Sequence, residues 1–124
     1  ECENNFNQNI DNVKFPDSLE ILIFGCNFNQ NIDKVKFPNN LKKLKFGYGF
    51  NQNVDYLPES LEILYLGRFY EKPINNLPDN IKILTIRSSY CKIKKIPKKL
   101  KKIFCYYKCL DCEIPDISSL VYDN

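Results

Sequence analysis

The stretch FNQNI at residues 6–10 returns as FNQNI at 28–32 and as FNQNV at 50–54, and a degenerate copy, YEKPI, stands at 70–74. Prolines mark the same interval at positions 16, 38, 58, 78, 97 and 115. The residues left between successive strands at this spacing are too few for a full crossover helix with its loops. The repeat therefore predicts a solenoid of short, similar coils.

Each coil contains one strand signal after its proline. Apolar residues recur three, six and eight positions after each of the first five prolines, as Leu19, Leu41, Leu61, Ile81, Leu100; Leu22, Leu44, Leu64, Leu84, Ile103; and Phe24, Phe46, Leu66, Ile86, Cys105. This alternation predicts a short strand that buries every second residue. Asn, Asp and Pro fill the returns and favour turns. We predict a mostly β, leucine-rich-repeat-like, right-handed solenoid with a concave parallel sheet and extended, turn-like or 3-10 convex segments.

One domain is expected over all 124 residues. The predicted coils are a partial repeat at 1–5, repeats at 6–27, 28–49, 50–69, 70–89 and 90–107, and a degenerate C-terminal cap at 108–124. The chain starts in mid-repeat, at Glu1 rather than Met. We therefore expect a piece of a longer chain, whose open end meets upstream repeats or a second copy.

The string LxxLxFGxxFNQxI, with a proline before the next Leu, resembles the FNIP repeat, a leucine-rich-repeat class of social amoebae and mimivirus-type giant viruses. The resemblance is close over 6–69 and degraded over 70–105. Asn9, Asn31 and Asn53 replace the proline of the family pattern FNxPI, and Pro73 conforms to it. Giant-virus members commonly have an F-box before the repeats. The resemblance therefore implies the substrate-recognition region of a ubiquitin-ligase adaptor, although no F-box is visible in this sequence.

Three repeated features have structural interpretations. The Asn and Gln of each FNQ triplet predict a polar ladder, in which a buried Asn carboxamide hydrogen-bonds the turn backbone of its own and neighbouring coils. The aromatic column predicts a core stack; its members are Phe6, Phe28, Phe50, Tyr70 and Tyr90. Gly25, Gly47 and Gly67 follow the strands, where close backbone approach or a positive φ is useful. Arg87 later occupies that column, so a positive φ is not required there.

Most catalytic chemistry is disfavoured by composition. The chain has no His, which excludes Ser-His-Asp and Cys-His nucleophile systems and every His-containing metal site. No glycine-rich phosphate loop is present, and no carboxylates converge on a nucleophile. We therefore expect no enzyme activity, cofactor or metal. No apolar run is long enough to span a membrane, and we expect a cytoplasmic location, in the host if the chain is viral.

Function is predicted on the concave face, where outward strand residues change type while the core columns repeat. These residues form an apolar patch with a basic rim, which is typical of a protein-binding surface. We expect Tyr65 and Phe104 to be the main anchors. The whole predicted partner-binding set is Ile21, Ile23, Lys43, Lys45, Ile63, Tyr65, Arg68, Ile83, Thr85, Lys102 and Phe104.

A lysine-rich coil within residues 87–108 offers an alternative function, the binding of nucleic acid or another polyanion. The residues concerned are Lys92, Lys94, Lys95, Lys98, Lys99 and Lys101. They interleave with apolar core positions, so a solvated coil surface is the competing interpretation. Nucleic acid is accordingly the less favoured partner.

The cysteines leave three alternatives open. Cys91 and Cys109 each lie six residues before a proline, so adjacent coils bring them within reach of a disulfide. Free thiols are the favoured alternative, and Cys105 takes a core column as a small buried hydrophobe. A zinc site of Cys91, Cys105, Cys109 and Cys112 requires strong local distortion, because the spacing lacks paired CxxC motifs.

Overall fold

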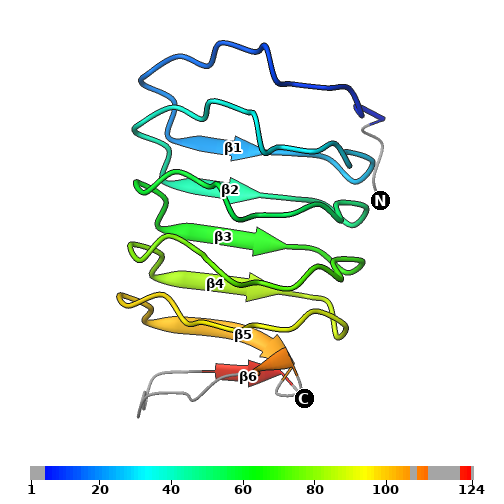
Figure 1. Cartoon of the computed structure of the whole chain (residues 1–124), viewed down its shortest axis with the longest axis vertical. Helices are drawn as coiled ribbons and strands as arrows, with labels where there is room; N and C mark the ends of the chain where they lie inside the picture. Colours follow the sequence, from blue (N-terminus) through cyan, green and yellow to red (C-terminus); the bar gives the residue numbers. More distant parts are fainter. Residues whose placement is uncertain (1–4, 107–108, 112–120, 124) are drawn as a thin grey trace.

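The computed structural model describes residues 5–106, 109–111 and 121–123. Its chain winds into a ladder of coils, each adding one short strand (Figure 1). The strands are β1 (Ile21–Ile23), β2 (Lys43–Lys45), β3 (Ile63–Leu66), β4 (Ile83–Ile86), β5 (Lys102–Tyr106) and β6 (Val121–Asp123). They form one parallel sheet in sequence order. The predicted mostly β solenoid is therefore confirmed.

Turns and extended segments make the returns between strands, as predicted, and the described residues contain no α-helix. A turn at Pro16, Pro38, Pro58, Pro78 and Pro97 starts the approach to the strand that follows; in the first coil the Leu19 N–H donates to the Pro16 carbonyl at 3.1 Å. None of the described residues forms a helix long and apolar enough to cross a membrane.

The predicted leucine columns set the strand register. Leu22 pairs with Leu44, Leu44 with Leu64, and Leu64 with Leu84 across successive strands. Leu44, Leu64 and Leu84 are fully buried, while their strand neighbours are partly exposed. One residue of slip would turn the leucines outward, so burial of this column fixes how each coil stacks on the last.

An aromatic stack runs behind the sheet. The rings of Phe28, Phe50 and Tyr70 are buried, and their centroids are 6.2 and 6.1 Å apart along the column. Phe6 stacks on Phe28 at the open end. The prediction is wrong for Tyr90, which is 72% exposed. Cys91 is fully buried next to it and takes its place, because the later coils are shorter and the register moves by one residue.

The predicted polar ladder is present. The backbone N–H of Asn29 donates to Asn7 Oδ1, and that of Asn51 donates to Asn29 Oδ1, both at 2.8 Å. Gln30 and Gln52 add side-chain bonds to the same oxygens at 2.9 and 3.1 Å. Asn7 and Asn29 are exposed, so the ladder seals the coil surface and is not buried within the core.

Close backbone approach explains the glycine column. A Cβ on Gly47 would lie 2.5 Å from the Gly25 carbonyl oxygen, and one on Gly67 would lie 2.4 Å from the Gly47 oxygen. No described glycine has a positive φ. Of the two predicted reasons for glycine, the structure supports the steric one.

Candidate functional site

The outward side chains on β1 to β5 and on the residues before them form a continuous surface, which we call the outer sheet face. Backbone pairing arranges them in three rows that run across the strands. The edge row is Glu20, Lys42, Glu62, Lys82 and Lys101; the middle row is Ile21, Lys43, Ile63, Ile83 and Lys102; the far row is Ile23, Lys45, Tyr65, Thr85 and Phe104. The predicted partner-binding strand residues therefore lie on one face.

Charges in the edge row compensate one another. Lys82 forms an ion pair with Glu62 on the neighbouring strand. Its hydrogen bond and its positive charge hold the pKa of the Glu62 carboxyl below its usual value, and Lys42 and Lys101 contribute further. Both members of the ion pair are partly exposed, so it adds little stability. Its main effect is to leave little free charge in this row.

The middle row is mainly apolar and open to solvent. Ile21 is 57% exposed at one end of the row, and Ile63 and Ile83, which neighbour each other beyond Lys43, are partly exposed. Its two cations, Lys43 and Lys102, form no ion pair with any residue in the described part of the chain. The row therefore combines accessible aliphatic surface with charge that no acidic neighbour offsets.

The far row meets a hollow at the end of the strands. The Lys45 ammonium lies 4.7 Å from the centroid of the Tyr65 ring, a cation–π contact. Arg68 makes a similar contact at 5.8 Å with Tyr48. Ile23, Lys45, Tyr48 and Tyr65 are among the residues that line a hollow of about 250 Å³. Tyr48 was absent from the predicted set, although it is 53% exposed and lies three residues after the end of β2.

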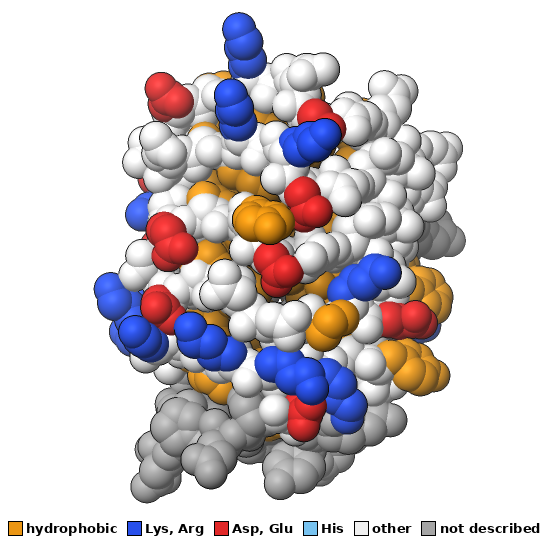
Figure 2. Space-filling model, in the orientation of Figure 1, with side chains coloured by type: hydrophobic (Ala, Val, Ile, Leu, Met, Phe, Trp, Pro, Cys, Tyr) orange, Lys and Arg blue, Asp and Glu red, His pale blue; other side chains and the backbone are white. Residues whose placement is uncertain are grey.

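The lysine-rich coil lies beside β5, and Figure 2 shows Lys and Arg side chains gathered at this height of the molecule. All six predicted lysines are exposed. Lys94 forms an ion pair with Asp111, and Lys98 lies 3.8 Å from an Asp79 oxygen. Asp111 has a lowered pKa because of the Lys94 hydrogen bond and charge. Part of the predicted polyanion-binding charge is thus already compensated.

Cys91 and Cys109, the candidates for a disulfide, are both buried free thiols, as is Cys105, which is the alternative that the sequence favoured. The Cys109 thiol donates to the Ser88 carbonyl oxygen at 3.4 Å. Burial raises the pKa of Cys91 to about 12, and the neighbouring Cys109 thiol adds to this rise. Within the described residues no group of three Cys, Asp or Glu is arranged to hold a metal. Cys26, to which the sequence analysis assigned no role, is disulfide-bonded.

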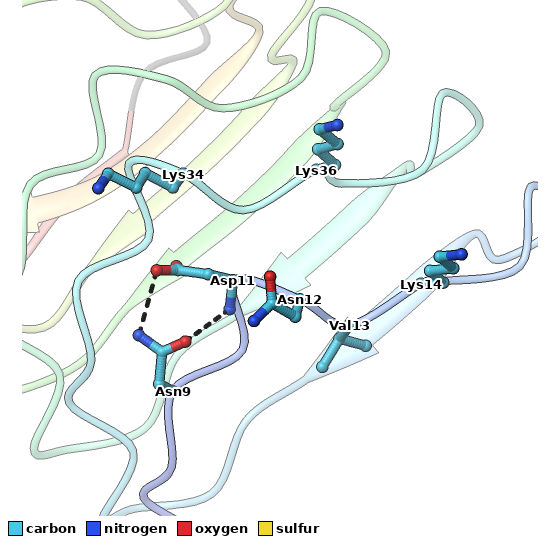
Figure 3. Close-up of a pocket in the computed structure, with 7 residues that line it drawn as sticks. All are labelled: Asn9, Asp11, Asn12, Val13, Lys14, Lys34 and Lys36. Atoms are coloured by element: carbon cyan, nitrogen blue, oxygen red, sulfur yellow. Dashed lines mark hydrogen bonds between the residues drawn. The ribbon is translucent and has the colours of Figure 1, made fainter.

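Two other hollows lie toward the first coils, and the second of them includes Ile23 of the far row in its lining. Asn9, Asp11, Lys14, Lys34 and Lys36 are among the residues lining one of about 530 Å³ (Figure 3). There Asn9 Oδ1 accepts from the Asp11 N–H at 2.9 Å, and the three lysine side chains diverge. That divergence does not suit the binding of a single anion.

The second hollow, about 310 Å³, is at the open end of the solenoid and is lined by apolar side chains that include Phe6, Val13 and Phe15. Phe6 and Val13 are each 42% exposed. None of the side chains that line this hollow is polar, so it offers no groups for chemistry.

Comparison with known proteins shows the repeat class. The family model described as FNIP Repeat matches residues 6–49, 28–69 and 50–89. The crystal structure of CroV588, described as a novel circular LRR protein, is 34% identical over 96% of this chain, with a TM-score of 0.75. The chain spans 19% of the length of that giant-virus protein. No curated protein matches this sequence significantly.

Proposed function

Because this chain belongs to the FNIP repeat family, we propose that it is a protein-interaction scaffold that binds its partner through the outer sheet face. One observation supports this most directly: aliphatic and aromatic side chains are open to solvent on the outer sides of β1, β3 and β4, with Lys43 and Lys45 of β2 between them. Ile21 and Ile23 are 57% and 58% exposed although they lie within a strand. Apolar surface left open to solvent beside basic side chains is typical of interaction sites.

The composition of the face fits a protein partner. Tyr65 offers a large ring at low entropic cost, and Lys45 already orients against it. Basic side chains around apolar ones resemble the rim and core of many interfaces. Repeat solenoids of this kind are typically non-enzymatic, and we propose that this one has no catalytic role.

Two finer parts of the proposal rest on the sequence and on the family resemblance. The first is that the bound partner is a substrate delivered to a ubiquitin ligase, with ligase components docking outside this chain. The second is a cytoplasmic location, in the host if the chain is viral. Polyanion binding by the lysine-rich coil is the weaker alternative, since Lys94 and Lys98 are partly compensated by Asp111 and Asp79.

The test is affinity capture from nuclease-treated host-cell lysate, with identification of the captured proteins by mass spectrometry. Tyr65→Ala together with Phe104→Ala removes both predicted anchors from the face. The matched control is Tyr56→Ala together with Tyr90→Ala, which removes two rings that are exposed but lie off the face. Lys95→Gln together with Lys99→Gln tests the lysine-rich coil.

We expect protein partners to survive nuclease, to be lost with Tyr65→Ala/Phe104→Ala and to be kept by the control pair. Loss of about 2 kcal/mol or more per central aromatic anchor corresponds to at least a 30-fold weaker affinity. Capture of nuclease-sensitive material that only the lysine variants reduce would refute the proposal and favour the alternative.

A further inference from the structure

The cations of the outer sheet face differ in whether they are already engaged. In the edge row, Lys82 pairs with Glu62. In the far row, Lys45 lies over the Tyr65 ring. Lys43 and Lys102 of the middle row have neither kind of contact with the described residues. Lys42 of the edge row has no such contact either, but its charge acts on Glu62 and lowers the pKa of that carboxyl. Lys43 and Lys102 are therefore the two cations on the face best suited to pair with an incoming carboxylate.

Strand pairing fixes the order along this row as Ile21, Lys43, Ile63, Ile83 and Lys102. Neighbouring strands in a sheet lie about 4.8 Å apart. Three such steps place Lys102 about 14 Å from Lys43 along the solenoid axis. Ile63 and Ile83 fill the interval, centred about 7 Å from either lysine.

An extended peptide has the same spacing on one of its sides. Alternate residues point the same way, and residues four apart are separated by about 13 to 14 Å. The residue midway between them is about 7 Å from each. Two acidic residues at i and i+4 therefore match Lys43 and Lys102, and an apolar residue at i+2 meets the surface of Ile63 and Ile83.

We propose that the outer sheet face binds an extended peptide segment that runs across the strands, with acidic residues at i and i+4 and an apolar residue at i+2. This inference rests on the proposed function and specifies the chemistry of its partner. Charge complementarity selects an acidic segment, because the middle row contains two lysines and no acidic residue. The exposed isoleucines select the apolar residue between the two acids.

The test uses two seven-residue peptides of identical composition and blocked ends. The matched peptide has Asp at its second and sixth positions, Ile at the fourth and Ser or Gly elsewhere. The control peptide places the two Asp side by side. Affinities for the whole chain are measured by NMR titration at about 0.15 M salt, where long-range attraction between the net charges is largely screened.

Each protein variant reverses the charge of two lysines. Lys43→Glu with Lys102→Glu reverses the middle row, whereas Lys14→Glu with Lys36→Glu makes the same change of net charge on exposed residues of the return segments. A third peptide has Lys in place of both Asp. Circular dichroism and backbone NMR spectra show that each variant remains folded.

We expect the native chain to bind the matched peptide up to about fivefold more tightly than the control peptide, because the control peptide can still form one of the two partly exposed ion pairs. Lys43→Glu/Lys102→Glu should reverse the preference toward the Lys peptide, and Lys14→Glu/Lys36→Glu should retain the native preference. Equal binding of the two acidic peptides, no measurable binding of either, or an equal loss in both variants would overturn the inference.

Failure of this inference is distinguishable from failure of the scaffold proposal. Protein partners lost with Tyr65→Ala/Phe104→Ala but kept by Lys43→Glu/Lys102→Glu would support the scaffold and overturn the acidic-segment inference. Partners unaffected by both pairs of substitutions would overturn both.

Discussion

Replacing Gly47 by Ala tests whether backbone contact between coils holds the solenoid together. The added Cβ would lie 2.5 Å from the Gly25 carbonyl oxygen and 2.7 Å from its carbon. The closer distance is about 0.9 Å short of the 3.4 Å at which ordinary contact begins. The obstructing atoms are backbone, so no side chain can rotate away, and the two coils must separate locally.

The cost has two parts and one offset. Overpacking of this kind costs about 1 to 3 kcal/mol. Separation also weakens the adjacent bond from the Gly49 N–H to the Cys26 carbonyl, 2.9 Å long, by about 0.5 to 1.5 kcal/mol. Alanine restricts the unfolded chain and returns about 0.4 to 1 kcal/mol. The expected net loss in the free energy of unfolding is therefore about 2 kcal/mol.

Urea unfolding measures this loss, followed by far-ultraviolet circular dichroism and by tyrosine fluorescence, since the chain has no Trp. Lys36→Ala is the control, because this exposed side chain should change the free energy of unfolding by no more than about 0.5 kcal/mol. A Gly47→Ala protein as stable as the native chain, with an unchanged urea dependence, would refute the close-approach argument.

Three further predictions concern hydrogen bonds and ionisation. Asn29→Ala should lower the free energy of unfolding in urea by about 1 kcal/mol, because the Asn51 N–H loses its acceptor. Asn29→Asp keeps an acceptor oxygen and should retain most of this stability, and equal losses in the two variants would contradict the prediction. The lowered pKa of Glu62 means that its pairing with Lys82 stabilises the fold above pH 4.5 and is lost as pH falls; Glu62→Gln should flatten this part of the stability curve, and an unchanged curve would count against the ion pair. Cys91, its pKa raised to about 12, should resist iodoacetamide at about pH 8 until the protein is denatured; rapid labelling of the native protein, seen by mass spectrometry, would disprove its burial.

The sequence was sufficient to predict the coil stacking. Periodic Leu44, Leu64 and Leu84 have one way to be buried together, so register followed from pattern alone. Prediction was weaker where the period shortens. Tyr90 is aromatic like the residues of the stacked column, yet the shortened coil leaves it exposed and places Cys91 in the core.

The candidate site was predictable in position but not in detail. Alternation placed Ile63, Tyr65 and Ile83 on the outward side, because a strand has only two faces. The pattern does not predict which side chains contact one another. The spacing places Lys43 and Lys45 on the same face, but it does not show that Lys45 contacts the Tyr65 ring while Lys43 forms no ion pair with the described residues. Tyr48 was missed because it follows the strand, where alternation no longer assigns a direction.

The polar ladder also bears on how such a chain can change length during evolution. Each Asn oxygen accepts from the coil that follows, 22 residues later at Asn7 and at Asn29. Gain or loss of one whole 22-residue unit in the gene would bring every remaining Asn back to an equivalent partner. In the fourth copy the triplet is YEK, and the Glu71 N–H still donates to Asn51 Oδ1. Glu71 has no carboxamide in the place of Asn51, so the Asn series ends there. The first coils are thus interchangeable modules, whereas the later ones are fixed in place by their own irregularity.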